Sequence, residues 1–311
     1  MSKVTVVGAG NVGATVANVL AHKDIVNEVV ILDIKGNFAK GKALDTWQQA
    51  PIDFYSTKTI GTDKYKDTAN SDIVVITAGI PRKPGMSRDD LISTNAKIVV
   101  SVTKEVLKYS KNPIIIIVSN PLDVMTYAAY KASKLNPNKV FGMAGILDTA
   151  RYRAFLATAL KVSPKDIQAV LMGGHGDTMV PLPRYTTVAG IPVLEMIDKK
   201  KLNAIVERTK KGGGELVKLM GTSAWYAPGA AAAQMVESII KDENRIFPCC
   251  AWLTGQYGLR NMYLGVPVKL GKNGITEILK LKLSKSELNG LKKSAKAVKD
   301  VMSTFKKMKI K

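Results

Sequence analysis

Gly8-Ala-Gly-Asn-Val-Gly13 directly follows the short β-branched run Lys3–Val7 and opens a helical pattern that includes Val16 and Leu20. A strand, a glycine turn and a helix in this order are typical of a dinucleotide-binding unit, because the glycines permit a tight turn and let phosphates approach the backbone closely. The positive end of the helix then receives the phosphates. The stretch therefore predicts an α/β fold that opens with a Rossmann-type unit.

An acidic residue stands where such a unit needs one. The strand Glu28–Leu32 leads into Asp33, twenty residues after Gly13. A carboxylate at this place accepts hydrogen bonds from ribose hydroxyls, and its charge repels a 2′-phosphate. The cofactor is therefore expected to be NAD rather than NADP. The residues of these segments predicted to contact it are Gly8, Gly10, Asn11, Val12, Gly13 and Asp33.

Strands and helices keep alternating through the first half of the chain. Residues 72–77 and 113–118 are apolar runs of buried-strand type, and a long helical pattern over residues 91–106 separates them. This alternation predicts a parallel, doubly wound sheet with right-handed crossovers, in which ligands bind beyond the carboxyl ends of the strands. We expect residues 1–144 to form this NAD-binding domain.

From about residue 145 the alternation loosens, which predicts a mixed α+β substrate domain over residues 145–311. Ser284 and Glu287 are spaced to form a capping box at the start of the final helix. The other helices are expected at residues 146–160, 199–220 and 230–241, and strands at residues 167–171, 179–188 and within 246–283.

The chain of 311 residues carries a formal net charge of +21, which invites a nucleic-acid or membrane hypothesis. Eleven of its lysines lie after residue 279, on a helical pattern whose other side holds apolar residues such as Leu291, Val298 and Phe305. Lysines opposite an apolar stripe usually form a solvated face. The remaining excess is scattered, without the interleaved aromatic residues that stack bases. We therefore expect no dedicated nucleic-acid partner and a general attraction for small anions.

Membrane and metal sites are not indicated. The longest purely aliphatic run, residues 114–118, is far shorter than the roughly 20 residues that span a bilayer. The N-terminus lacks the apolar stretch of a secretory signal. Cys249 and Cys250 are adjacent, which is poor geometry for a disulfide and the wrong spacing for a structural metal site. The sequence predicts a cytoplasmic protein with reduced, buried cysteines, no membrane partner and no metal.

His175 is the histidine best placed for proton chemistry. It stands between glycines in Met172-Gly-Gly-His-Gly-Asp-Thr-Met179, where little side-chain bulk crowds a ligand. A histidine has an unperturbed pKa near neutrality, so it can gain and lose a proton within one catalytic cycle. The other histidine, His22, lies beside Lys23 and Asp24 near the end of a predicted helix, which is typical of a solvated residue. A plain turn histidine is the alternative for His175 on this pattern alone.

A basic loop, Thr77-Ala-Gly-Ile-Pro-Arg82-Lys-Pro-Gly-Met-Ser-Arg88, follows the strand at residues 72–77. Its glycines and prolines interrupt regular structure, and its two arginines suit a mobile lid over an anionic substrate. An exposed basic loop is the alternative. Ser119-Asn120-Pro121 follows the next strand and is expected at the same edge of the sheet.

Five segments, in this order, strongly resemble the lactate/malate dehydrogenase family, and most of all its lactate-dehydrogenase-like malate dehydrogenases. They are Gly8-Ala-Gly-Asn-Val-Gly13, residues 77–91, Val118-Ser-Asn-Pro-Leu-Asp123, Leu147-Asp-Thr-Ala-Arg151 and Gly173-Gly-His-Gly-Asp177. The resemblance covers essentially the whole chain. It implies an enzyme that moves a hydride between (S)-malate and NAD, giving oxaloacetate and NADH.

The resemblance also implies a role for each matching residue. His175 would be the acid/base group, Asp148 the carboxylate that stabilises its imidazolium, and Arg88 the cation that polarises the substrate carbonyl, where charge builds during reduction. Arg151 would hold the C1 carboxylate with its planar fork, and Arg82 would select malate over lactate. The remaining matches are Asn120 near nicotinamide and substrate, Asn95 and Val118 at the cofactor, and Ser223 in the substrate pocket.

Lactate dehydrogenase, or another 2-hydroxy acid dehydrogenase, is the nearest alternative. A basic nucleic-acid-binding protein on a dinucleotide fold is the non-enzymatic one, and the high charge is its only support. An NAD-using glycosidase would need a metal held by cysteine and histidine, whereas Cys249 and Cys250 lie far from His175 in the sequence. The family resemblance further implies a homo-oligomer, a tetramer in preference to a dimer, and a place in the tricarboxylic acid cycle.

Overall fold

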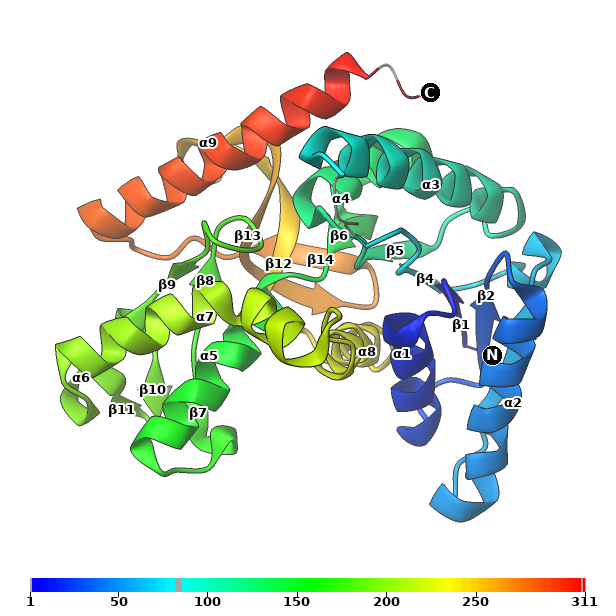
Figure 1. The fold of residues 1–311 in the computed structure, drawn as a ribbon, viewed down its shortest axis with the longest axis horizontal. Helices are drawn as coiled ribbons and strands as arrows, with labels where there is room; N and C mark the ends of the chain where they lie inside the picture. Colours follow the sequence, from blue (N-terminus) through cyan, green and yellow to red (C-terminus); the bar gives the residue numbers. More distant parts are fainter. Residues whose placement is uncertain (1, 82–85, 309, 311) are drawn as a thin grey trace.

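A continuous nine-stranded sheet carries strands from both halves of the chain (Figure 1). The computed structural model describes residues 2–81, 86–308 and 310. The strand order is β14-β13-β12-β6-β5-β4-β1-β2-β3, and β1 to β6 run parallel. These parallel strands are β1 Lys3–Val7, β2 Glu28–Leu32, β3 Lys58–Thr62, β4 Ile73–Ile76, β5 Ile114–Ile117 and β6 Val140–Gly142. The predicted parallel, doubly wound sheet is confirmed.

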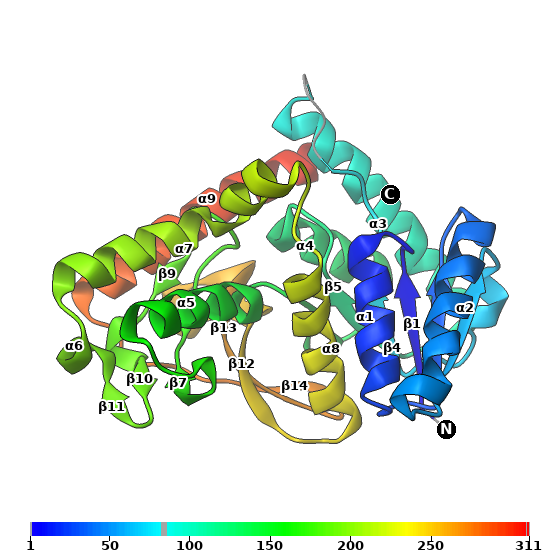
Figure 2. The same cartoon turned by 60° about the horizontal axis from the view of Figure 1, so that its bottom comes forward.

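Helices cover both faces of this sheet (Figures 1 and 2). On one face α1 packs against α2 and α8, and on the other α4 packs against α3 and α9. Strands between two helix layers are buried on both sides, which is why β4 and β5 are unbroken apolar runs. The helices are α1 Asn11–His22, α2 Gly36–Asp53, α3 Arg88–Tyr109, α4 Leu122–Ser133, α8 Tyr226–Ile240 and α9 Lys285–Lys307.

A second lobe lies beside the sheet and has its own apolar cluster, which includes Tyr152, Leu156 and Leu202. Its helices α5 and α7 pack against each other, and several two-residue strands surround them. The elements of this lobe are α5 Gly145–Leu160, β7 Ile167–Gln168, β8 Leu171–Met172, β9 Val180–Pro181, β10 Thr187–Val188, β11 Ile191–Pro192, α6 Val193–Met196 and α7 Lys199–Met220.

The last three strands do not stay in the second lobe. β12 Arg245–Thr254 pairs antiparallel with β6 through Cys250 and Gly142, and β13 Arg260–Gly271 and β14 Gly274–Ile278 follow it. The strand runs expected within residues 246–283 therefore extend the N-terminal sheet. Both halves of the chain share one large core as a result.

α2 and β3, within residues 36–62, are two elements that the sequence pattern does not predict. In α2, Ala43 and Ala50 are buried while Leu44 and Trp47 are exposed, so apolar residues lie on both sides of the helix. A helix with two apolar sides lacks the amphipathic period by which a helix is found in a sequence.

Other local expectations are met. Ser284 and Glu287 form the predicted capping box of α9, and Leu291, Val298 and Phe305 are buried along one side of that helix. Cys249 and Cys250 are free and buried. Within the described ranges, the helices include none that is long and apolar enough to cross a membrane.

Candidate active site

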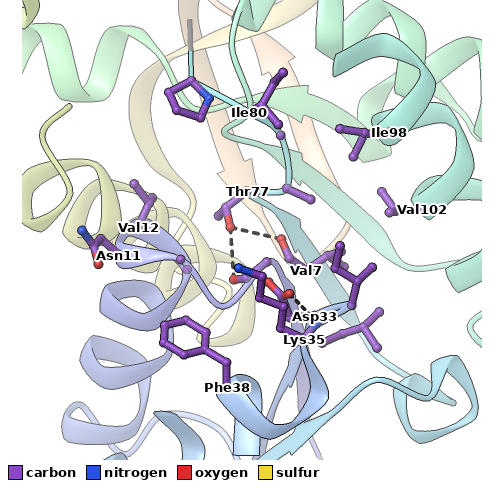
Figure 3. Close-up of a pocket in the computed structure, with 18 of the residues that line it drawn as sticks. Val7, Asn11, Val12, Asp33, Lys35, Phe38, Thr77, Ile80, Ile98 and Val102 are labelled. Atoms are coloured by element: carbon purple, nitrogen blue, oxygen red, sulfur yellow. Dashed lines mark hydrogen bonds between the residues drawn. The ribbon is translucent and has the colours of Figure 1, made fainter. Parts of the chain in front are cut away.

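A cleft of about 560 Å³ opens at the carboxyl ends of β1, β2 and β4, beside the start of α1 (Figure 3). Asn11 and Val12 lie on one side, Ile98 and Val102 on the other, and Val7 between them. The described residues that line it include all six predicted from the first two segments: Gly8, Gly10, Asn11, Val12, Gly13 and Asp33.

Two glycines of the turn serve different purposes. A Cβ at Gly13 would lie 1.9 Å from the carbonyl oxygen of Gly8, so this glycine lets α1 pack against the turn. A Cβ at Gly10 would meet no protein atom within 4 Å, so the space beside it is open to a ligand. Gly10 is the N-cap of α1, whose start has no side-chain cap and no acidic residue in its first turn. The backbone N–H groups in the first turn of α1 therefore remain available to an anion such as a pyrophosphate.

Asp33 is anchored to the glycine turn. Its Oδ2 accepts a hydrogen bond from the backbone N–H of Ala9 at 2.7 Å, and its Oδ1 accepts one from Lys35 at 2.9 Å. Each carboxylate oxygen keeps a second lone pair for a ribose hydroxyl. The residues of the cleft thus fit a dinucleotide.

Asn95 links two loops at the same edge of the sheet. Its side-chain amide bonds both backbone groups of Ile80, and its Nδ2 donates to the carbonyl of Asn120 at 2.7 Å. Asn95 is buried, and neither it nor the half-buried Val118 is among the described lining residues of the cleft. Asn120 is exposed and precedes a cis peptide bond to Pro121. Asn95 thus holds the two loops together at this edge, and its predicted cofactor contact stays a prediction.

His175 and Asp148 form the predicted pair. The His175 Nδ1 lies 2.9 Å from Asp148 Oδ2, and the Asp148 side chain is only 3% exposed. Asp148 belongs to the first turn of α5, whereas His175 follows β8, so tertiary packing brings them together. With its Nδ1 proton directed to Asp148, the imidazole keeps Nε2 for a substrate.

Opposing effects act on the imidazole. Burial lowers the pKa of His175, but the carboxylates of Asp148 and Asp123 outweigh it, so the pKa lies above its ordinary value. A raised pKa keeps the protonated form populated near neutrality, which suits a group that must give a proton to a carbonyl oxygen.

Arg151 lies one helical turn after Asp148. Its Nη1 is 3.4 Å from Asp148 Oδ1, and burial lowers the pKa of its guanidinium although Asp148 opposes this. Its Nε is buried and has no hydrogen-bond partner within the described part of the chain. An unsatisfied buried donor costs about 1–3 kcal/mol, so this group is prepared for an acceptor such as a carboxylate. Gly212 of α7 makes room for it, because a Cβ there would lie 3.2 Å from Arg151 Cδ.

Asp123 is a site residue to which the sequence analysis gives no role. Its Oδ2 accepts from the backbone N–H of His175 at 3.2 Å, and its Oδ1 accepts from the Cys250 thiol at 3.2 Å. Burial raises the pKa of this carboxyl group. It belongs to α4, three residues after Asn120, so the quoted segment contained it, but only packing shows that it supports the histidine loop.

The remaining predicted residues are distributed around the site. Arg88 is exposed at the first position of α3, directly after the N-cap Ser87. Ser223 lines the cofactor cleft with Thr222 and Trp225. Arg82 lies outside the described residues.

An open nucleotide cleft and a buried histidine–carboxylate pair on one α/β fold define a dinucleotide-dependent oxidoreductase. The chain matches the lactate/malate dehydrogenase NAD binding domain over residues 2–142 and the alpha/beta C-terminal domain of lactate/malate dehydrogenases over residues 146–309. It is 68% identical over 304 residues to the malate dehydrogenase of Cytophaga hutchinsonii, a match that covers 97% of each chain.

Solved structures agree. The malate dehydrogenase of Salinibacter ruber has a TM-score of 0.95 at 53% identity, covering 98% of each chain. The lactate dehydrogenase of Cryptosporidium parvum, solved with lactic acid and nicotinamide adenine dinucleotide, has a TM-score of 0.93 at 37% identity, covering 97% of each chain. The chain therefore belongs to the lactate/malate dehydrogenase family, and its cofactor is NAD.

Proposed function

We propose that this chain catalyses the reversible, NAD-dependent oxidation of (S)-malate to oxaloacetate. The main support is the His175–Asp148 pair, in which Nδ1 lies 2.9 Å from Oδ2. The half-buried Arg151 lies one helical turn after Asp148 in α5. A proton acceptor and a carboxylate clamp at this spacing suit a 2-hydroxy acid. The name of the Cytophaga hutchinsonii relative, malate dehydrogenase, supports malate in particular.

In malate oxidation, His175 accepts the hydroxyl proton at Nε2 while the hydride leaves C2, so the O–H and C–H bonds break as the C=O bond forms. Bound NAD supplies the hydride acceptor. Asp148 stabilises the imidazolium that results, because its buried carboxylate lies 2.9 Å from Nδ1. In the reverse direction, His175 returns this proton to the carbonyl oxygen of oxaloacetate.

Other side chains position the substrate in this proposal. Arg151 holds the C1 carboxylate, and Arg88 polarises the carbonyl, for which charge-assisted hydrogen bonds are the strongest available. Asn120 contacts the nicotinamide side and the substrate. The smaller contributions proposed are those of Asn95 and Val118 behind the cofactor and of Ser223 at the pocket wall.

Arg82 carries the choice of substrate in this proposal, through the second carboxylate that oxaloacetate has and pyruvate lacks. Closed over pyruvate, the guanidinium would be buried without a partner, which costs about 3–5 kcal/mol. The test compares kcat/KM for oxaloacetate and pyruvate with NADH, in the natural chain and in Arg82→Gln. We expect the ratio to collapse from roughly 10³–10⁵, mostly through loss on oxaloacetate. A ratio that stays within a few-fold would contradict the assignment, and a natural preference for pyruvate would make lactate the substrate.

We also propose a homo-oligomer. α2 and the residue after it leave large apolar side chains in solvent, with Ile52 73% and Phe54 91% exposed beside Leu44 and Trp47. Such a patch supports a contact with a second copy of the chain. The preference for a tetramer over a dimer comes from the family resemblance. Light scattering of the natural chain and of Trp47→Lys measures the assembly, and an unaltered mass in the variant would exclude this face.

The division into domains is likewise a proposal. A boundary near residue 145, with residues 1–144 binding NAD and residues 145–311 binding substrate, is supported by the end of β6 at Gly142 and the start of α5 at Gly145. We place the enzyme in the tricarboxylic acid cycle, because malate and oxaloacetate are its substrates. We also propose a cytoplasmic location, which the two free cysteines support, because disulfides are rare in that compartment.

A further inference from the structure

The outer end of the cofactor cleft, beyond β2 and β3, holds two carboxylates, of which the sequence analysis assigns only Asp33. Leu32 of β2 pairs with Thr62 of β3, and the Asp33 N–H donates to the Thr62 carbonyl at 3.0 Å. Asp33 and Asp63 therefore follow neighbouring strands at the same edge of the sheet. Both line the cleft. Any cofactor whose ribose meets Asp33 must also lie near Asp63.

Asp63 lies over the start of α2. A Cβ on Gly36, the first residue of that helix, would come within 2.8 Å of Asp63 Oδ2. The absence of a side chain at position 36 thus makes room for this carboxylate at the positive end of the helix. Without this carboxylate, the start of a helix just after the second strand would favour the binding of a phosphate.

The two carboxylates differ in how they are held. Both oxygens of Asp33 accept backbone hydrogen bonds, from Ala9 and Lys35. The carboxylate of Asp63 has no hydrogen bond or ion pair with any residue that the structure describes. Asp33 is held by the glycine turn and would also meet the ribose, whereas Asp63 has no partner among the described residues and leaves its charge in the cleft.

Long-range charge cannot select NADH. The 2′-phosphate of NADPH adds about −1.5 to −2 charges, so a chain of net charge +21 attracts NADPH more strongly than NADH. Lys35 is the sole cation among the described lining residues, and it lies beside Asp33 (Figure 3). The discrimination must come from local groups that oppose both Lys35 and the field of the whole chain.

We propose that Asp63 is a second cofactor-specificity residue, which acts with Asp33 to exclude the 2′-phosphate by placing a carboxylate at the start of α2. This inference rests on the proposed NAD-dependent function. With both acids present, the charge of Asp33, Asp63 and Lys35 sums to −1. Without Asp63 it is zero, and without both acids Lys35 faces the cleft alone.

The experiment measures kcat/KM for NADH and NADPH with oxaloacetate, at low and high salt, in a series of charge variants. Asp63→Asn should raise the NADPH/NADH ratio about fivefold, the upper end of what one exposed charge contact contributes. Asp63→Lys should raise it further, and Asp33→Ser/Asp63→Asn should exceed either single change. These gains should shrink at high salt, because salt screens exposed charges. Asp300→Asn in α9 removes the same charge away from the cleft and should leave the ratio unaltered.

The proposal would be overturned by an NADPH/NADH ratio that stays constant in both Asp63→Asn and Asp63→Lys. If kcat/KM falls equally for both cofactors, the ratio is constant in this way, and Asp63 is then a contact of the shared adenosine. Asp63→Ser replaces Asp63→Asn if that variant folds poorly. Fluorescence titration without substrate measures the Kd values of NADH and NADPH, so it tests the role of Asp63 independently of turnover. A chain that does not reduce oxaloacetate would refute the proposed function, and the titration would still show whether Asp63 affects cofactor choice.

Discussion

The two ends of the active site, the cofactor cleft and the acid/base pair of His175 and Asp148, use different chemical groups. At the cofactor end, the backbone supplies the main features: Gly13 lets α1 approach the turn, and the uncapped start of α1 leaves N–H groups available to an anion. At the acid/base end, paired side-chain charges supply them, because the half-buried His175 and Arg151 both lie against the buried Asp148. The first end therefore depends on free space, and the second depends on burial and on pairing of charges.

The largest effect is expected at the acid/base end. His175→Asn should slow turnover about 10²–10⁴-fold, the usual contribution of a general acid. The Kd for NADH should stay near that of the natural chain, because His175 is not among the described lining residues of the cleft. Steady-state kinetics and NADH fluorescence titration separate the two quantities. Full activity in the purified variant would assign the proton transfer to another residue.

Two alanine variants test the role of space at the cofactor end. Gly13→Ala places a methyl group 1.9 Å from the Gly8 carbonyl oxygen, so it should lower stability by about 1–3 kcal/mol as well as weaken NADH binding. Gly10→Ala meets no protein atom within 4 Å, so it should weaken binding about tenfold, or about 1.4 kcal/mol, with an unaltered Tm. Thermal melts and NADH titration distinguish them. Equal Tm losses in both variants would contradict the division of roles.

A third prediction tests the charge pairing behind His175. In Asp148→Asn the pKa of His175 should fall, because burial lowers it and only Asp123 still raises it. Oxaloacetate reduction uses the protonated imidazole, so its rate decreases as pH rises through this pKa, and the decrease should move to lower pH. A pH profile of kcat/KM measures the shift. Asp177→Asn, which removes an exposed carboxylate of the same loop, is the control. A profile that does not move would exclude Asp148 as the source of the raised pKa.

The smallest effect concerns both ends together. Because substrate and cofactor are anions and the net charge is +21, kcat/KM should fall about fivefold from low to physiological salt. The same salt series on kcat, at saturating oxaloacetate and NADH, should be flat, since the capture of the anions does not enter that quantity. A flat profile for the natural enzyme would show that steering does not contribute.

The cofactor end could be predicted from local patterns. One continuous stretch, residues 3–33, contains the strand, the glycine turn, the helix, the second strand and the acid. Their spacing alone therefore places them, and the structure has all of the predicted turn residues in the cleft. Asp63 could not be predicted as a cleft residue, because β3 and α2 lack a clear periodic pattern. Its place beside Asp33 depends on the pairing of β3 with β2.

At the acid/base end, the glycine-flanked motif indicates His175, but its partners could be predicted only through the family resemblance. His175 and Asp148 are 27 residues apart in sequence, and Asp123 is 52 residues from His175. The amide of Asn95, which ties Ile80 to Asn120, makes a further contact between distant segments. No spacing rule within one helix or strand predicts such contacts.

The sequence by itself determined the class of sheet, the glycine turn, the cofactor and the candidate histidine His175, because these follow from patterns within a strand, a turn or a helix. Tertiary structure alone decided that β12 joins β6, that Asp123 supports the histidine loop, and that Asp63 stands over Gly36. Hydrogen bonding and burial between distant segments depend on how the layers pack. A buried carboxylate acquires its effect on a histidine only when packing excludes water from between them.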